Sequence, residues 1–376
     1  MSAALQTSVI TDAKRLVIKI GSSLLVNAEG SLRSDWLEGL ADDIAALNGA
    51  GTQVVLVSSG AIALGREALG YTGRPSRLEG AQAAASVGQI RLAQAYQSVF
   101  EKHGSVVAQI LLTLGDMEDR PRYLNARNTL DELLQRGAIP VINENDTVAT
   151  SEIRFGDNDR LAARVAQMVS ADTLILLSDI DGLYSADPRT NTDAELITSV
   201  ETITADIEAM AGKAASSGIG SGGMITKIEA AKIALAGGCS MAIVNGTHTN
   251  PINRTIAGAS FTLFKASTSP LAVRKSWIRG LMAPQGALHI DGGAVAALER
   301  DASLLPAGVV KTDGNFKRGD LVSLLNPAGA IFGQGIVSYS FADTAKLQGK
   351  NMRDARALLG YSGRSALVHR DDLVLF

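Results

Sequence analysis

Two lysines stand at positions where an anionic partner is expected. Lys19 lies inside the apolar run 16–20, directly before a Gly-Ser-Ser turn, and Lys227 follows the glycine-rich segment 217–223. Burying an ammonium group costs free energy unless an opposite charge or a ligand compensates, so Lys19 indicates an anion nearby. Lys227 taken alone is more typical of a solvated helical lysine. Two lysines that reach the same anion would suit the transfer of a phosphoryl group.

Three turns rich in glycine or serine accompany these lysines. They are 21–23 after the run 16–20, 58–61 after the run 54–57, and 217–223 before an expected helix. Glycine lets backbone N–H groups approach an anion closely, and a helix N-terminus adds partial positive charge. One such turn is weak evidence, but three turns with two lysines make a phosphoryl-transfer site the leading hypothesis.

Two clusters of Asn and Asp form the densest polar segments of the chain. Asn143-Glu144-Asn145-Asp146-Thr147 follows the run 139–142, and Gly156-Asp157-Asn158-Asp159-Arg160 opens an expected helix. Asn and Asp also favour ordinary turns and caps, so each cluster alone fits a plain loop equally well. Carboxylates beside lysines can orient those lysines or hold Mg²⁺, which is the functional reading.

Familiar nucleotide motifs give little support to other enzyme classes. A Walker A sequence is absent. Gly218, Gly220 and Gly223 match the pattern Gly-x-Gly-x-x-Gly of dinucleotide-binding enzymes. They come late in the chain, however, and do not follow its first strand, so a dehydrogenase is poorly supported. Ser178 and Asp179 end the run 173–177 and are typical either of a cap or of a nucleotide contact.

The elements that must position these residues alternate strand and helix. Predicted strands are 16–20, 53–58, 105–112, 139–143, 173–178 and 240–244, and predicted helices include 78–102, 125–136, 158–170 and 223–236. Ser34 is expected to cap a further helix with leucines and an isoleucine on one face. Apolar strands separated by helices predict an α/β fold with a mainly parallel sheet sandwiched by helices. Ligands of such sheets bind beyond the carboxyl ends of the strands.

The sequence changes character after about residue 265. Residues 266–284 are predicted to be a linker, and 285–376 a small β-rich domain with runs at 287–290, 308–312, 321–325 and 331–338. One or two helices are expected there, around 294–298 and 342–359. Residues 1–265 would form the catalytic domain.

Composition narrows the class of protein. The 376 residues carry a net charge of −3, and residues 280–376 hold ten Lys/Arg against nine Asp/Glu, far from a strong nucleic-acid binder. Cys239 is the single cysteine and the four histidines are scattered, which excludes an intrachain disulfide and disfavours a Cys- or His-based metal site. With no signal-peptide pattern and no apolar run of about 20 residues, a soluble cytoplasmic protein is expected.

These motifs, taken in order, resemble those of the amino acid kinase family. The segments that carry the resemblance are Lys19-Ile20-Gly21-Ser22-Ser23, Ser58-Ser59-Gly60-Ala61-Ile62, Asn143-Glu144-Asn145-Asp146, Gly156-Asp157-Asn158-Asp159, Ser178-Asp179 and 220–227. The likeness is greatest to members that phosphorylate the γ-carboxylate of L-glutamate as the first step of proline synthesis. Residues 308–338 are similar to a PUA domain. The fold expected is therefore that of an amino acid kinase followed by a PUA-like domain.

The resemblance assigns roles to particular residues. Lys19 and Lys227 would contact the transferring phosphoryl group, and Asp159 would hold both lysines in position. Ser59, Asp146 and Asn158 would bind glutamate. ATP, with Mg²⁺, would be bound by Lys19, Ser178, Asp179, Ser221, Gly222, Gly223, Met224, Ile225, Thr226 and Lys227; no residue is assigned as a metal ligand. Small departures are Ser22 and Ser178 in place of threonine, and Arg160 in place of a neutral polar residue.

Partners and alternatives follow from the same comparison. The resemblance implies L-glutamate and ATP as substrates, proline as feedback inhibitor, and a homo-oligomer. The enzyme alternatives are family members that act on acetylglutamate, aspartate, carbamate or UMP. The alternative from another class is an RNA-binding protein that uses the PUA-like domain, a role that the near-neutral charge of that domain does not favour.

Overall fold

The chain folds into two compact units. The computed structural model describes residues 3–27, 29–73, 75–148, 158–212, 223–280, 283–361 and 363–376. The first unit spans Met1–Pro270 and the second spans Leu271–Phe376. The residues of the proposed phosphoryl-transfer site belong to the first unit.

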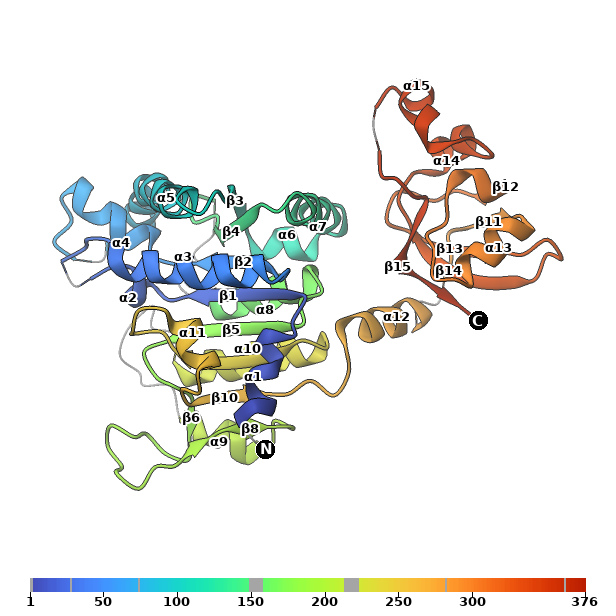
Figure 1. Cartoon of the computed structure of the whole chain (residues 1–376). Helices are drawn as coiled ribbons and strands as arrows, with labels where there is room; N and C mark the ends of the chain where they lie inside the picture. The colour runs from blue at the N-terminus through green and yellow to red at the C-terminus, as the bar shows by residue number, and fades with distance from the viewer. Residues whose placement is uncertain are drawn as a thin grey trace. The chain divides into compact units, whose positions relative to one another are not determined.

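An eight-stranded sheet forms the middle of the first unit (Figure 1). Its strands run in the order β3-β4-β2-β1-β5-β9-β10-β8, and only the β9–β10 pair is antiparallel. The strand bounds are Arg15–Ile20 for β1, Gln53–Ser58 for β2, Val107–Leu112 for β3, Ile139–Glu144 for β4, Thr173–Ser178 for β5, Ser199–Val200 for β8, Ser240–Asn245 for β9 and Phe261–Phe264 for β10. The predicted mainly parallel α/β sheet is confirmed.

Alternation along β1 divides the core between the two faces of the sheet. Leu16 and Ile18 point into a cluster with helices α3 (Ser34–Gly49) and α5 (Leu78–Glu101). Val17 points to the other face, where α7 (Arg120–Gln135), α8 (Asn158–Met168) and α10 (Met224–Ala236) pack. Successive strand residues face opposite sides, so Lys19 shares the face of Val17, and it meets α8 and α10. The alternation thus places a lysine beside two helix N-termini.

Several local predictions differ from the structure. Ser34 is the first residue of α3, and the N-cap is Arg33 without a side-chain cap bond, so the predicted serine cap is wrong. Helix α7 begins earlier than predicted because the Asp119 side chain accepts a hydrogen bond from Arg122 N and a proline stands in its first turn. Elements that the sequence pattern missed include α1 (Ala3–Thr11), β6 (Leu183–Tyr184), β7 (Leu196–Ile197), β8, α9 (Ala205–Met210), α11 (Pro251–Ile256) and β10.

The second unit is built on a five-stranded sheet of order β12-β11-β13-β14-β15. Its bounds are Gly286–Ile290 for β11, Val309–Gly314 for β12, Leu321–Leu325 for β13, Ile331–Val337 for β14 and Val368–Leu375 for β15. All pairs are antiparallel except β11–β13. Helix α13 (Gly292–Leu298) matches the first expected helix. The second is divided into α14 (Phe341–Leu347), a 3₁₀ turn (Met352–Asp354) and α15 (Ala355–Leu359).

Helix α12 (Pro270–Gly280) occupies most of the stretch 266–284 that was expected to be a linker. Its Ile278 is fully buried with Leu321, Ile336 and Val374 of the second sheet. The helix therefore packs as part of the second unit. None of the helices among the described residues is long and apolar enough to cross a membrane.

Candidate active site

A cavity of about 510 Å³ opens at the carboxyl ends of four adjacent strands, β4, β2, β1 and β5. Its lining is Lys19, Gly21, Ser22, Ser23, Leu24, Ser59, Gly60, Ala61, Ile62, Ala63, Arg66, Asn143, Glu144, Asp146, Asn158, Leu177, Ser178, Asp179 and Lys227. The strand order reverses around β1, since β2 lies on one side and β5 on the other. A crevice at such a reversal is where open α/β sheets bind ligands.

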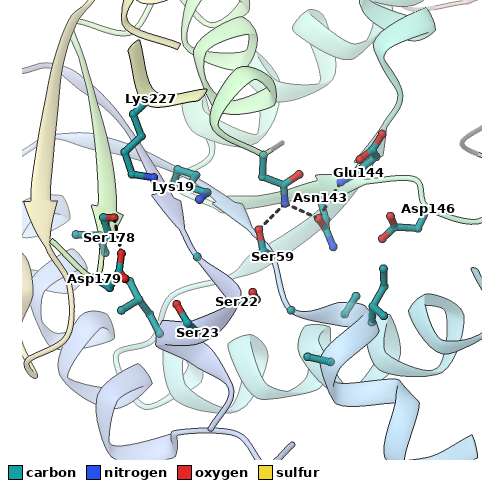
Figure 2. A pocket seen from close by; sticks show the side chains of 18 of the residues that line it. Lys19, Ser22, Ser23, Ser59, Asn143, Glu144, Asp146, Ser178, Asp179 and Lys227 are labelled. Carbon is teal, nitrogen blue, oxygen red and sulfur yellow. Dashed lines mark hydrogen bonds between the residues drawn. The ribbon is translucent and has the colours of Figure 1, made fainter. Parts of the chain in front are cut away.

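One buried carboxylate holds both lysines at the centre of the cavity. Lys19 Nζ lies 2.7 Å from Asp159 Oδ1, and Lys227 Nζ lies 3.1 Å from Asp159 Oδ2. Thr226 Oγ1 also donates to Asp159 Oδ2, at 3.0 Å. Asp159 is 1% exposed, whereas each lysine keeps a small exposed fraction towards the cavity (Figure 2). Asp159 lies on α8, Lys19 on β1 and Lys227 on α10, and these three elements meet on one face of the sheet.

The charge state of this cluster follows from its contacts. Burial raises the pKa of Asp159, but the ammonium groups of Lys19 and Lys227 outweigh burial and lower that pKa to about 2. Lys19 and Lys227 thus present two ammonium groups to one carboxylate, and both lysines line the cavity. The cluster is therefore prepared for an anion in the cavity.

A chain of amide hydrogen bonds forms a second part of the wall. Asn158 Nδ2 donates to Ser58 O at 2.9 Å, to Ser59 Oγ at 2.7 Å and to Asn143 Oδ1 at 3.2 Å. Asn143 Oδ1 also accepts from Glu144 N at 2.9 Å. Figure 2 shows Ser59 between the lysines and Asn143, with Glu144 and Asp146 beyond Asn143. Asn158 and Asp159 are neighbours, so one helix start orients both the ion pairs and the amide chain.

Close packing of α4 (Ala61–Arg66) on α5 fixes the part of the cavity wall that α4 forms. Gly60 adopts φ +105, a left-handed conformation that favours glycine, and starts α4. A Cβ at Gly88 would lie 1.7 Å from Ala61 O, and a Cβ at Gly65 would lie 1.8 Å from Ala84 O. Helices α4 and α5 therefore touch backbone to backbone.

The opposite side of the cavity carries Ser178 and Asp179 at the end of β5 (Figure 2). Ser178 Oγ donates to Asp179 Oδ1 at 3.2 Å. Gly21 follows β1, and a Cβ at that position would lie 3.8 Å from Lys19 Nζ. A side chain at Gly21 would therefore fill cavity space next to the Lys19 amine.

The predicted site residues are placed as follows. Seven of them, Lys19, Ser59, Asp146, Asn158, Ser178, Asp179 and Lys227, line the one cavity, and Asp159 lies buried behind the lysines. Gly223 is the N-cap of α10, followed by Met224, Ile225 and Thr226 in its first turn; among described residues, these four are not part of the lining. Ser221 and Gly222 lie outside the described residues.

Sequence reasoning assigned no role to several residues that the geometry brings in. Asn143 connects Glu144 to Asn158, and a buried asparagine at the end of an apolar strand is a signal that could have found it. Arg66 lines the cavity from α4 and adds a third cation. The Thr226 hydroxyl donates to Asp159, a contact that the sequence did not predict; its role as a nucleotide contact stays a prediction.

Two family models and several known proteins are similar to this chain. The amino acid kinase family model matches residues 14–245, and the PUA domain model matches residues 286–359. Glutamate 5-kinase from Cereibacter sphaeroides is 54% identical over 371 residues, which cover 99% of this chain and 100% of that protein. Glutamate 5-kinase from Jannaschia sp. is 56% identical over 367 residues, 97% of this chain and 99% of that protein. The solved structure of UMP kinase from Bacillus anthracis is 17% identical to this chain, with a TM-score of 0.47. The match covers 68% of this chain and 98% of the UMP kinase chain. The chain therefore belongs to the amino acid kinase family, and a PUA domain follows its kinase domain.

Proposed function

We propose that the protein transfers the γ-phosphoryl group of ATP to the γ-carboxylate of L-glutamate, forming glutamate 5-phosphate for proline synthesis. The observation that carries the proposal is the cluster of Lys19 and Lys227 on Asp159, at the centre of a cavity with polar groups on both sides. The full-length likeness to glutamate 5-kinases supports glutamate as the acceptor.

The chemistry of the acceptor suits a site without a general base. A γ-carboxyl group titrates near ~4.3, so it is already ionised at neutral pH and needs no proton removed. Rate enhancement then rests on placing the two substrates in line and on neutralising charge as the phosphoryl group moves. Lys19 and Lys227 supply that charge from fixed positions, because Asp159 orients both amines before the substrates bind.

The amide chain and Asp146 suit the amino-acid head of the acceptor. Asp146 would accept from the ammonium group, and Ser59 Oγ, which accepts from Asn158, keeps its own proton to donate to the α-carboxylate. Asn158 was expected to be a second donor, but its NH₂ group is occupied by three protein acceptors. We therefore assign its remaining oxygen, Oδ1, as an acceptor for the ammonium group.

Mg²⁺ would enter with the nucleotide. Among the described residues no group of three His, Cys, Asp or Glu could hold a metal ion, and Asp159 is already paired with two lysines. Mg²⁺ bound to nucleotide phosphates commonly keeps most of its ligands as phosphate oxygens and water. Phosphate oxygens and water, with at most one carboxylate such as Asp179, would then complete its coordination.

The remaining expectations concern regulation and assembly. We propose proline as a feedback inhibitor, since it presents the same ammonium and α-carboxylate as glutamate, and we propose a cytoplasmic homo-oligomer. RNA binding by the second unit stays a prediction that its near-neutral charge does not favour.

The test is turnover of ATP with L-glutamate, followed by trapping of the acyl phosphate as a hydroxamate with hydroxylamine. Acetylglutamate, aspartate, carbamate and UMP are run as competing acceptors under the same conditions. Glutamate should give the highest kcat/KM. A higher value for any other acceptor would contradict the proposal.

A further inference from the structure

Gln89 supports the cavity wall from behind. It lies on α5, is half-buried, and is not among the residues that line the cavity. Its Oε1 accepts a hydrogen bond from Asn143 Nδ2 at 2.9 Å. Asn143 in turn accepts from Asn158, whose amide holds Ser59. Gln89 is therefore the far end of a chain of side chains that leads to the predicted glutamate contacts.

Backbone groups inside this chain fix the direction of every amide. Ser58 O can only accept, so the group of Asn158 that faces it must be the NH₂. Glu144 N can only donate, so the group of Asn143 that faces it must be the oxygen. The NH₂ group of Asn143 must then donate to Gln89, and the side-chain oxygen of Gln89 must accept that hydrogen bond. A group at position 89 that cannot accept would leave the NH₂ of Asn143 without this partner.

Helix α5 is itself held against the same wall. Tyr96 lies seven residues after Gln89, two helical turns along the same face, and its hydroxyl lies 2.9 Å from Ser58 Oγ. Gly88, next to Gln89, gives the backbone contact with Ala61 of α4. Two side-chain contacts and one backbone contact thus set where α5 sits relative to the β2–α4 turn that carries Ser59.

We propose that Gln89 is a positioning residue for the amino-acid end of the cavity. It orients Asn143, which sets Asn158 and, through Asn158, Ser59 Oγ. The inference rests on the proposed function, since it assumes that Ser59 and Asn158 contact the amino acid. Because the chain of amides ends before Lys19 and Asp179, binding of the nucleotide should not depend on it.

The test compares three variants of α5 in the full-length protein. Gln89→Met keeps length and bulk but removes the acceptor, whereas Gln89→Glu keeps an oxygen where Oε1 lies. Gln97→Met is the matched control, because Gln97 is an exposed glutamine of the same helix. KM for glutamate, KM for ATP and kcat are measured for each, with thermal unfolding to confirm that each variant folds.

For Gln89→Met we expect KM for glutamate to rise about tenfold, the loss typical of one hydrogen bond, with KM for ATP within about twofold of the parent. Gln89→Glu should recover most of that loss, and Gln97→Met should match the parent. An unchanged KM for glutamate in Gln89→Met, or equal rises in both KM values without recovery in Gln89→Glu, would overturn the positioning role. Failure of the parent protein to turn over glutamate would instead overturn the proposed function, and the inference with it.

Discussion

Each unit of the molecule buries a carboxylate between two cations, yet the two clusters do different things. In the first unit Asp159 pairs with Lys19 and Lys227 beside a cavity. In the second unit Asp372, on β15, pairs with Arg274 of α12 and lies 3.9 Å from Arg364. Lys19 and Lys227 line the cavity, whereas neither Arg274 nor Arg364 is part of its lining.

The difference lies in the type of cation and in the space around it. Arginine has a planar fork that binds a carboxylate through several N–H groups, which makes a strong structural clamp. Lysine is a compact charge that can contact one carboxylate and still present N–H groups to a ligand. The lysine side chains are 10% and 7% exposed and the arginine side chains 14% and 29%, so exposure alone does not separate the two clusters. What separates the clusters is the type of cation and the position of both lysines in the lining of a cavity with polar walls.

The largest effect is expected from the lysines of the first cluster. Lys19→Ala and Lys227→Ala should each lower kcat by roughly 10²–10³, since each removes a preorganised charge from the transferring phosphoryl group. The measurement is steady-state turnover with glutamate. Lys232→Ala is the control, because Lys232 lies on the same helix and pairs with surface glutamates. A variant at Lys19 or Lys227 with kcat near that of the parent would remove that lysine from the chemistry.

Asp146→Ala should act on glutamate and spare ATP. Loss of a charged partner for the ammonium group should cost about 2–4 kcal/mol, a rise in KM for glutamate of roughly 30-fold or more. KM for ATP is measured in parallel. Equal weakening of both substrates would mark Asp146 as structural or metal-organising, and an unchanged KM for glutamate would remove it from the site.

Arg274→Met should weaken the second cluster without touching catalysis. Arg274 Nε donates to Asp372 Oδ1 at 2.7 Å, and loss of a charged hydrogen bond costs about 2 kcal/mol of stability. We expect earlier unfolding of the second unit in a denaturant titration, with kcat unchanged. Lys275→Met, at the next position of α12 and partly exposed, should have little effect. A fall in kcat alone would show that Asp372 is not purely structural.

Much of this organisation could be predicted because it follows from periodicity. The apolar strands, the lysine inside β1 and the polar strand ends placed most of the cavity correctly. The sequence pattern did not reveal α12 within the stretch that was expected to be a linker. A short amphipathic helix with Pro, Ser and Arg gives a weak pattern, and burial of Ile278 in another element stabilises it. Gln89 could not be found from sequence, since its importance comes from Asn143, which lies 54 residues away.

Removal of residues 271–376 should change kcat by no more than a few-fold, because every residue that lines the cavity precedes that boundary. The cut belongs before α12, since a cut at Gly280 would leave Ile278 without its buried partners. The truncated protein is checked for folding by circular dichroism and for turnover with glutamate. Normal folding without turnover would place part of the active site in the second unit.

The smallest expected effect is the pH dependence of the stability that Asp159 contributes. The pKa of Asp159 is lowered to about 2, while an aspartate in the unfolded chain titrates near ~3.9, so its stabilising effect is complete above about pH 4 and is lost as pH falls through 2. The stability difference between the parent and Asp159→Asn should therefore be constant from about pH 5 to 8. It should shrink below about pH 4. A difference that changes between pH 5 and 8 would contradict the charge state assigned here.

The backbone contact between α4 and α5 has a practical consequence for protein engineering. Ala61, Ile62, Ala63 and Arg66 of α4 line the cavity, but the spacing of α4 from α5 is set by Gly65 and Gly88, where even a methyl group would collide with a carbonyl oxygen. Mutagenesis aimed at new acceptors should leave both glycines alone and diversify Ile62, Ala63 and Arg66. The two helices then act as a fixed frame, so that changes in acceptor preference can be assigned to the side chains that were varied.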